Sequence, residues 1–268
     1  MTKKILIACE YSGIVRDAFI KKGHDAWSCD ILPSEGDPNN NHKHLMYDVN
    51  YALDLIEDWD VIIAFPPCTY LCNSGARWLS DSRYPNRKEE QRHAIDFVKR
   101  IWNYNCNFIC IENPIGALSS KFRKPSQYIQ PYEFGHDASK KTCLWLKGLP
   151  NLVPTSDMTK EQVTYVTLSN GKRFSKWEYD IACKGAKQRS KLRSKFWTGV
   201  ASAMADQWTD YWNTLDQISN QKEIRYMELK KRLRTLPTDR VCEKSYAVKS
   251  EITLELFAKM MGIPFIRM

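Results

Sequence analysis

Short apolar runs alternate with amphipathic segments through roughly the first 115 residues. Some of these runs are too short for buried helices and predict strands, namely "KILIAC" (4–9), "DAWSCDI" (25–31), "DVIIAF" (60–65) and "NFICIENP" (107–114). Between them, apolar residues at helical spacing predict helices in "GIVRDAFIKKG", "YALDLIEDW" and the segment 86–105. Apolar strands that alternate with helices are typical of a parallel sheet with right-handed crossovers. The sequence therefore predicts an α/β fold.

The later part of the chain has a different pattern. Segment 140–155 predicts a strand that runs into a Pro/Gly loop, and Asn170-Gly171 within 163–177 is the dipeptide most typical of a hairpin turn. Helical patterns follow in "KEIRYMELKKRLR" and "SEITLELFAKMMGIP". The patterns divide the chain into an α/β core, a small β-rich insertion, a basic segment with a helix that closes the core, and a helical C-terminal tail, at 1–119, 120–185, 186–212 and 213–268.

Composition argues against secreted and membrane-spanning proteins. No apolar run approaches the ~18 residues that a membrane helix needs. The first residues, "MTKKILIACEYSG", turn polar and acidic where a signal peptide would stay apolar. The nine cysteines are odd in number and scattered, which argues against a disulfide framework. We therefore expect a cytoplasmic protein without a membrane partner.

The charge of the chain favours a polyanionic partner, since the formal net charge is +9 and the sequence pI is about 9.0. The stretch "KQRSKLRSKFW" contains alternating cations at Lys187, Arg189, Lys191, Arg193 and Lys195. In an extended chain this period of two places all their side chains on one side, whereas a helix would scatter them. A solvated basic loop is one interpretation, but we favour a segment that contacts phosphates.

Polar residues follow several predicted strands at the points where the strands end. They are Glu10 to Gly13, Asp30, Cys68 after two prolines, and Glu112. The carboxyl ends of parallel strands meet at one edge of a sheet, where α/β proteins bind their ligands. We therefore expect these groups to surround one crevice.

The stretch "AFPPCTYLC" leaves several roles open for Cys68: metal ligand, disulfide partner, buried packing residue or nucleophile. A zinc site would need a second Cys or His pair, and in the similar pair Cys106 and Cys110 the second cysteine lies within a predicted apolar strand, so we expect no metal. The two prolines fix φ and remove two backbone donors, which is a costly way to place an inert residue. Cys68 is therefore a candidate nucleophile and Glu112 a candidate acid, while we treat Cys72 as a packing residue.

These motifs resemble those of the DNA cytosine-5 methyltransferase family. The family's catalytic loop carries Pro-Cys after an apolar strand, and its second acidic motif is Glu-Asn-Val after a later one. Pro67-Cys68 and Glu112-Asn113 match these motifs in the family's order, with Pro114 in the place of valine. The resemblance implies a Rossmann-like sheet that binds S-adenosylmethionine, and DNA as the partner.

Segments 142–155 and 194–208 are similar to parts of the short, phage-type members of that family, so the resemblance covers roughly residues 4 to 212. It implies that the insertion at 120–185 is a DNA-recognition region and that the basic segment from Lys187 to Lys195 holds DNA. A viral member would act in the host cytoplasm, and we favour a monomer.

The resemblance also implies catalytic roles. Cys68 would attack carbon 6 of cytosine as a thiolate, and Glu112 would hydrogen-bond ring nitrogen N3. Carbon 5 would then accept a methyl group from S-adenosylmethionine, on a base flipped out of the duplex. The family's Gln-x-Arg-x-Arg motif supplies an arginine to the cytosine carbonyl, and no clear equivalent is present. Gln188 with Arg189, or Arg77, could substitute, and we favour Arg77.

For the cofactor, an acid at the end of the second strand is expected to bind ribose, which points to Asp30. The family's first motif is Phe-x-Gly-x-Gly, of which "ACEYSG" keeps Gly13. The predicted cofactor-binding residues are Glu10, Tyr11, Ser12, Gly13, Asp30, Asp48 near the adenine, and Pro66.

Two other functions stay open. The short insertion favours an enzyme that modifies carbon 5 of a free cytosine nucleotide. The degenerate "ACEYSG" turn and the basic tail favour a catalytically silent DNA-binding protein with a methyltransferase fold.

Overall fold

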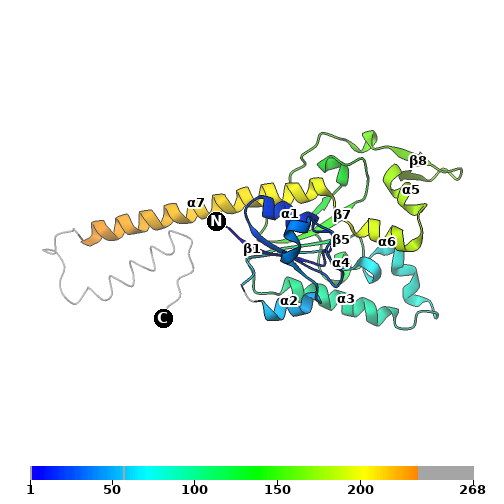
Figure 1. Ribbon diagram of the computed structural model, residues 1–268, viewed down its shortest axis with the longest axis horizontal. Helices are drawn as coiled ribbons and strands as arrows, with labels where there is room; N and C mark the ends of the chain where they lie inside the picture. Colours follow the sequence, from blue (N-terminus) through cyan, green and yellow to red (C-terminus); the bar gives the residue numbers. More distant parts are fainter. Residues whose placement is uncertain (1, 57, 235–268) are drawn as a thin grey trace. The chain divides into compact units, whose positions relative to one another are not determined.

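A seven-stranded sheet lies at the centre of the first structural unit, Met1–Leu215, in a computed structural model that describes residues 2–56 and 58–234 (Figure 1). Its strands are β1 Lys4–Ala8, β2 Asp25–Cys29, β3 His44–Leu45, β4 Val61–Ala64, β5 Phe108–Pro114, β6 Gln127–Ile129 and β7 Thr142–Lys147. Their order across the sheet is β3-β2-β1-β4-β5-β7-β6. The strands predicted at 4–9, 25–31, 60–65 and 107–114 are all present, each within a few residues of its predicted ends.

The pairing of the strands confirms an α/β fold with a mostly parallel sheet. Strands β1 to β5 pair in parallel, whereas β7 pairs antiparallel with both β5 and β6. The order therefore follows the doubly wound arrangement 3-2-1-4-5-6, with one antiparallel strand placed between the fifth and the sixth. This arrangement is compatible with a Rossmann-like fold.

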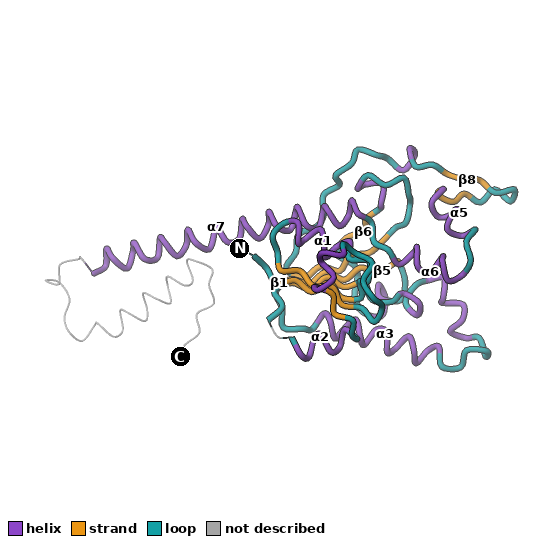
Figure 2. Tube along the Cα trace, viewed as in Figure 1, coloured by secondary structure: helices purple, strands orange, loops and turns teal. Residues whose placement is uncertain are grey.

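Helices cover both faces of the sheet (Figures 1 and 2). The α-helices are α1 Ile14–Lys21, α2 Val49–Leu55, α3 Arg87–Trp102, α4 Leu118–Lys121, α5 Lys176–Ala182, α6 Ala186–Ser194 and α7 Thr198–Arg234. Shorter 3-10 helices are η1 Pro38–Lys43, η2 Cys68–Tyr70, η3 Asn73–Ser80, η4 Pro131–Phe134 and η5 Lys160–Gln162. The helices predicted from "GIVRDAFIKKG", "YALDLIEDW" and 86–105 are confirmed as α1, α2 and α3.

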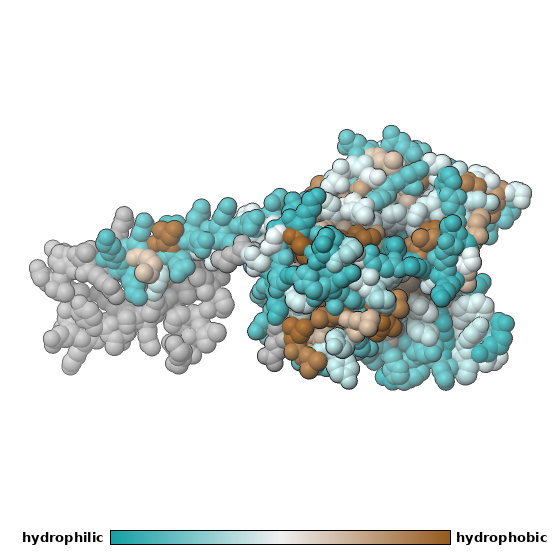
Figure 3. Space-filling model, in the orientation of Figure 1, coloured by the Kyte–Doolittle hydropathy of each residue, from teal (hydrophilic) through white to brown (hydrophobic). Residues whose placement is uncertain are grey.

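The core consists of two apolar layers, because side chains of a strand point alternately to opposite faces of the sheet. In β1, Ile5 and Ile7 pack with α1 and the first part of α7, whereas Leu6 and Ala8 pack with α2 and α3. In the view of Figure 3 the outer surface is mostly hydrophilic or neutral, with limited apolar patches. Within the described residues, no helix combines the length and the apolar composition needed to cross a membrane.

The segment 120–185 differs in part from the predicted insertion. Its first strands, β6 and β7, belong to the central sheet, so the structure has no boundary at residue 120. The physical reason is burial, because Thr142 to Trp145 are buried in β7, which pairs with β5 on one side and with β6 on the other. The predicted hairpin is confirmed as a separate two-stranded sheet of β8 Tyr165–Thr167 and β9 Arg173–Ser175.

The basic segment is helical, and the prediction of an extended chain was wrong. Residues Ala186–Ser194 form α6, with Gly185 ahead of it and Lys195 in extended conformation after it. Lys, Arg, Gln and Leu all favour helix, and this local preference outweighs the alternation of charge. Lys187 and Lys191 therefore lie on one side of α6, and Arg189 and Arg193 lie on another.

The second unit is Asp216–Met268, close to the tail predicted at 213–268. The described part of this unit, up to residue 234, is helical, which confirms the helix predicted from "KEIRYMELKKRLR" as part of α7. The helix predicted at 250–264 lies outside the described residues.

Candidate functional site

A cleft of about 920 Å³ lies at the carboxyl ends of the parallel strands. The sheet order reverses between β1 and β4, and in open α/β sheets ligands bind in the crevice at such a switch point. The volume is within the range of small-molecule sites. The predicted site residues that line this cleft are Tyr11, Asp30, Asp48, Pro66, Cys68, Glu112, Arg193 and Lys195.

Cys68 lies at the first position of η2, directly after Pro66 and Pro67, and its residue surface is exposed. The protein atoms around the thiol desolvate its thiolate, and nearby Cys72 and Glu112 add like charge, so the pKa of Cys68 is raised. Lys140 opposes this shift by its positive charge. Cys68 is thus an exposed residue at the cleft, and ionisation of its thiol depends on a nearby cation or base.

The proline loop is fixed to the end of β5 by Asn113. The buried Asn113 side chain donates from Nδ2 to the carbonyl oxygen of Pro66 at 2.7 Å. On the other side, Phe65 N donates to Ala8 O at 2.9 Å. These bonds set the position of Cys68 relative to β1 and β5. Within the described residues, the buried Oδ1 of Asn113 has no hydrogen-bond partner.

Glu112 lies in β5 and is one of the residues that line the cleft. Desolvation raises the pKa of Glu112, while the Lys140 charge and a hydrogen bond from the Thr142 side chain lower it by less. A carboxyl with a raised pKa is more readily protonated, and a protonated carboxyl donates a hydrogen bond. Glu112 can therefore serve as an acid or donor to a ligand in the cleft.

Lys140 is a cleft residue that sequence reasoning missed. It lies two residues before β7, and the antiparallel pairing of β7 with β5 brings this end of β7 beside the end of β5, as the pair Thr142 and Pro114 shows. The only local signal was a pair of lysines ahead of a predicted strand. Its charge acts on both Cys68 and Glu112.

Arg77, predicted to contact the substrate, does not line the cleft. It lies on η3 with an exposed side chain, and its guanidinium carbon is 4.4 Å from the ring centre of Trp78. Lys140 does line the cleft, and its charge acts on both Cys68 and Glu112.

The predicted cofactor residues divide into two groups. Asp30 and Asp48 line the cleft, where Asp30 accepts a bond from Leu32 N at 2.9 Å and Asp48 caps α2 by accepting from Asn50 N at 2.8 Å. Burial raises the pKa of Asp30. Tyr11 also lines the cleft, and its hydroxyl donates to Lys191 O at 3.0 Å.

Glu10, Ser12 and Gly13 do not line the cleft. They lie in the turn before α1 and stabilise the start of this helix. Glu10 accepts bonds from Val15 N at 2.7 Å and Arg16 N at 3.2 Å, which satisfies free N–H groups of the helix start. Gly13 has φ +70°, and an added Cβ would lie 2.7 Å from Gly36 Cα. These positions shape the turn after β1.

The cations of α6 have mostly internal partners. Glu35 binds Lys191 and also Lys195, the latter at 3.0 Å, while Arg193 lies 4.0 Å from Glu178. Lys187 and Arg189 are exposed, without a carboxylate partner in the described part of the chain. Only Arg193 and Lys195 of the predicted basic set line the cleft.

Aromatic side chains form the wall of the cleft next to α6. The ring centres of Phe65 and Phe196 are 4.6 Å apart. The ring centre of Trp197 lies 4.7 Å from that of Trp177 and 5.1 Å from that of His136. Phe65, Phe196 and Trp197 line the cleft, so it offers flat apolar surfaces to a planar ligand.

Neither a metal-binding group among the described residues nor a similarity to a known protein indicates the function of this site. Across residues 2–56 and 58–234, no group of three or more His, Cys, Asp or Glu side chains is placed to hold a metal ion. Comparison with protein-family models gives no match for the chain, and comparison with curated proteins gives none. Function therefore has to be inferred from the residues of the cleft.

Proposed function

We propose that the chain is an S-adenosylmethionine-dependent methyltransferase that acts on carbon 5 of cytosine in DNA. The observation that carries this proposal is the presence of Cys68, Glu112 and Lys140 in one cleft at the ends of β4, β5 and β7. A thiol, a carboxyl of raised pKa and a cation are the groups that covalent activation of a pyrimidine ring needs.

The activation follows from the chemistry of these groups. Carbon 5 of cytosine is a poor nucleophile until the thiolate of Cys68 adds to carbon 6 and pushes electron density into the ring. Protonated Glu112 donates a hydrogen bond to N3, where negative charge develops. Lys140 favours the thiolate of Cys68 over the thiol. Release requires loss of the carbon 5 proton and departure of the Cys68 thiolate from carbon 6.

The cleft also fits the cofactor. Asp30 and Asp48 present carboxylates, which accept hydrogen bonds from ribose hydroxyls or an ammonium group, and Ile31, Tyr47 and Val49 offer apolar surface beside them. S-adenosylmethionine carries a ribose, an ammonium and a flat adenine. When bound, the cofactor supplies the methyl group that carbon 5 accepts.

DNA as substrate is supported by the charge of the chain and by the form of the cleft. The target carbon lies inside the duplex stack, so the base has to leave the stack at a cost of a few kcal/mol. Phe65, Phe196 and Trp197 offer ring faces that can pack on an extruded base. The net charge of +9 favours association with the phosphate backbone.

The test is transfer of labelled methyl groups to DNA, together with covalent trapping on DNA that contains 5-fluorocytosine. We expect Cys68→Ser to lower transfer by at least about 10³-fold and to abolish the adduct, because the nucleophile is lost. Cys72→Ser is the matched control and should retain most activity. Absence of transfer and adduct with the wild-type chain, or full activity of Cys68→Ser, would refute the proposal.

A free cytosine nucleotide is the second candidate substrate. It is favoured by the small size of the separate β8–β9 sheet, which leaves little structure outside the core to recognise a DNA sequence. A comparison of dCMP with oligonucleotide in the same assay decides between the substrates. Calorimetry with S-adenosylhomocysteine tests the third possibility, since a silent DNA-binding protein would show no cofactor binding.

A further inference from the structure

A set of exposed and half-buried arginine and aromatic side chains follows Cys68 in the chain. We call it the arginine–aromatic surface, and its members are Tyr70, Arg77, Trp78, Arg83, Tyr84 and Arg87. The guanidinium carbon of Arg83 lies 5.5 Å from the Trp78 ring centre, and the rings of Trp78 and Tyr84 meet edge to face at 5.4 Å. Guanidinium groups and aromatic rings therefore lie next to one another along η3 and the start of α3.

This surface is continuous with the cleft. Tyr70 lines the cleft together with Cys68, and the guanidinium carbon of Arg87 lies 4.6 Å from the Tyr70 ring centre. Arg87 also donates from Nη2 to the carbonyl oxygen of Thr69 at 2.7 Å, next to Cys68 in the chain. A ligand that runs along the arginine–aromatic surface would therefore reach Cys68.

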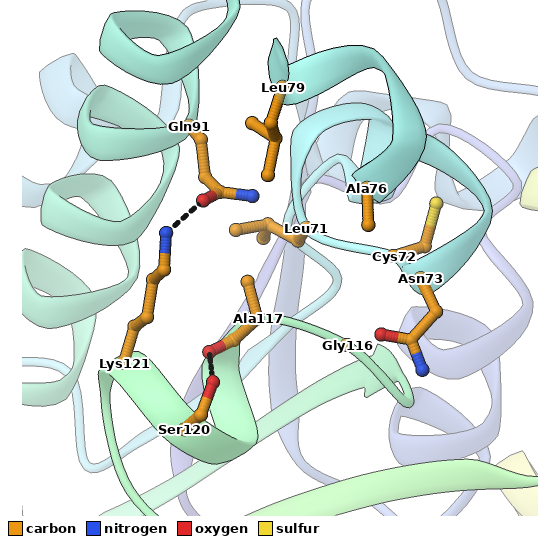
Figure 4. A pocket seen from close by; sticks show the side chains of 10 residues that line it. All are labelled: Leu71, Cys72, Asn73, Ala76, Leu79, Gln91, Gly116, Ala117, Ser120 and Lys121. Carbon is orange, nitrogen blue, oxygen red and sulfur yellow. Dashed lines mark hydrogen bonds between the residues drawn. The ribbon is translucent and has the colours of Figure 1, made fainter.

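The surface rests on a fixed backbone, which is visible around the small pocket of about 200 Å³ in Figure 4. Ala117 N donates to Leu71 O at 2.7 Å, and an added Cβ on Gly116 would lie 1.9 Å from the same oxygen. Gln91 donates to Tyr70 O at 2.8 Å and accepts a bond from Lys121, which Figure 4 shows. The segment that carries Arg77 is thus tied to α3 and to the turn after β5.

Of the three arginines on this surface, two are not neutralised by a carboxylate of the described residues. Arg83 forms a bidentate pair with Asp81, at 3.0 and 2.7 Å, which neutralises it. Arg77 and Arg87 have no carboxylate partner among the described residues. A guanidinium that lies over a ring can still donate from its N–H edge, which matches a phosphate. Arg77 and Arg87 therefore offer phosphate contacts beside exposed ring surface of Tyr84.

We propose that the arginine–aromatic surface binds a stretch of unpaired DNA strand that leads into the cleft. Aromatic rings and arginines along a backbone track are the features that bind single strands, since unstacked bases pack on rings while phosphates meet arginines. In a duplex the faces of the bases are hidden by stacking, so a duplex would contact only the charged arginines of this surface. The inference rests on the proposed function in one respect, namely that the chain binds DNA.

The experiment measures binding of the full chain to fluorescent oligo(dT) and to a duplex of equal length, by anisotropy at several salt concentrations. Oligo(dT) contains no cytosine, so methyl transfer does not enter the readout. Tyr84→Leu removes an exposed ring and Arg77→Gln removes an unpaired charge. The matched controls are Tyr51→Leu, an exposed tyrosine on α2, and Arg100→Gln, whose arginine pairs with Asp54 on another part of the unit.

We expect Tyr84→Leu to weaken oligo(dT) binding by about tenfold, the loss that corresponds to one stacked base, and duplex binding by much less. Arg77→Gln should weaken binding to both and reduce the salt slope for oligo(dT) by about 0.7, as for one phosphate contact. Equal losses for Tyr84→Leu on both ligands, or losses no greater than those of the controls, would overturn the inference.

The outcomes separate this inference from the proposed function. If the chain transfers no methyl group to DNA but binds oligo(dT) through Tyr84 and Arg77, the proposed function fails and the inference stands. If the chain methylates DNA and both variants bind oligo(dT) as the wild type does, the inference alone fails. Circular dichroism of each variant shows whether the fold is retained.

Discussion

At the scale of single residues, Lys140 opposes the shift that raises the pKa of Cys68, the proposed nucleophile. Its charge lowers the pKa of Cys68 against desolvation and against the charges of Cys72 and Glu112. We expect Lys140→Met to raise the pKa of the Cys68 thiol and to slow its alkylation by iodoacetamide severalfold at pH 7, because less thiolate is present.

Lys141→Met serves as the control for this prediction. Lys141 is the next residue, is exposed, and lies over the ring of Tyr128 instead of in the cleft. Alkylation should be followed on Cys68 by peptide mass analysis, since other thiols are present. Equal rates for the two lysine variants would show that Lys140 has no electrostatic effect on Cys68.

Glu10 gives a second prediction at this scale, which concerns stability. Burial raises the pKa of Glu10 from its ordinary value of 4.5 to about 6. The hydrogen bonds that Glu10 accepts from Val15, Arg16 and Ser12 lower the pKa by less than burial raises it. The folded state therefore prefers the protonated form. Its contribution to stability is fully present below pH 4.5 and is lost as pH rises through about 6.

The expected size is about 2 kcal/mol, because a shift of one pKa unit corresponds to about 1.4 kcal/mol. Urea unfolding of wild type and Glu10→Gln between pH 4 and pH 7.5 tests this. The difference in unfolding free energy between the two proteins should change by that amount across the range, in favour of Glu10→Gln at the higher pH. A constant difference would mean that Glu10 does not titrate with a raised pKa.

At the scale of elements, α6 is held to the loop after β2 by charge. Glu35 binds both Lys191 and Lys195, and the two lysines lower the pKa of Glu35. Under the proposed function, Glu35 therefore pairs with two cations that would otherwise be available to a DNA phosphate. We expect Glu35→Gln to strengthen DNA binding at low salt and to steepen the slope of log K against log[salt] by up to about 1.8, as for two further contacts.

The control for this prediction is Glu89→Gln on α3, which removes an exposed carboxylate that pairs with Arg92. It changes the net charge by the same amount and leaves the cations of α6 unchanged. A similar gain in DNA binding for both variants would assign the effect to net charge, and no gain for Glu35→Gln would show that Lys191 and Lys195 do not contact DNA.

The same element shows where sequence reasoning fails. The strands and α1 to α3 were predictable because burial on one or two faces leaves a periodic apolar pattern. The alternating charges of Lys187 to Lys195 carry no such information, since a solvated face tolerates cations at any spacing. Helix preference and the pairs with Glu35 and Glu178 decide the conformation there.

At the scale of the whole molecule, the site depends on pairing between distant segments. The cleft position of Cys68 and Glu112 was predictable, because carboxyl ends of parallel strands meet at one edge. The place of Lys140 was not, since it follows from the antiparallel pairing of β7 with β5, for which the local sequence has no signal. The roles of Glu10 and Ser12 at α1 likewise depend on hydrogen bonds that spacing alone does not specify.

The last prediction concerns how much of the chain the fold needs. The first unit ends at Leu215, and the buried Trp208 and Trp212 near its end pack in the layer that covers one face of the sheet. A chain that ends at residue 215 should therefore fold and keep its thermal midpoint within about 4 °C of the full chain, the shift that corresponds to about 1 kcal/mol.

A chain that ends at residue 207 is the matched control, because it differs by only a few residues and lacks both tryptophans. Loss of a buried tryptophan costs about 3–5 kcal/mol, and the lost bond from Trp208 Nε1 to Pro150 O adds to this. Since a domain is stable by only about 5–15 kcal/mol, the shorter chain should not show cooperative unfolding. If the 215-residue chain also failed to fold in calorimetry, the core would need residues beyond the first unit.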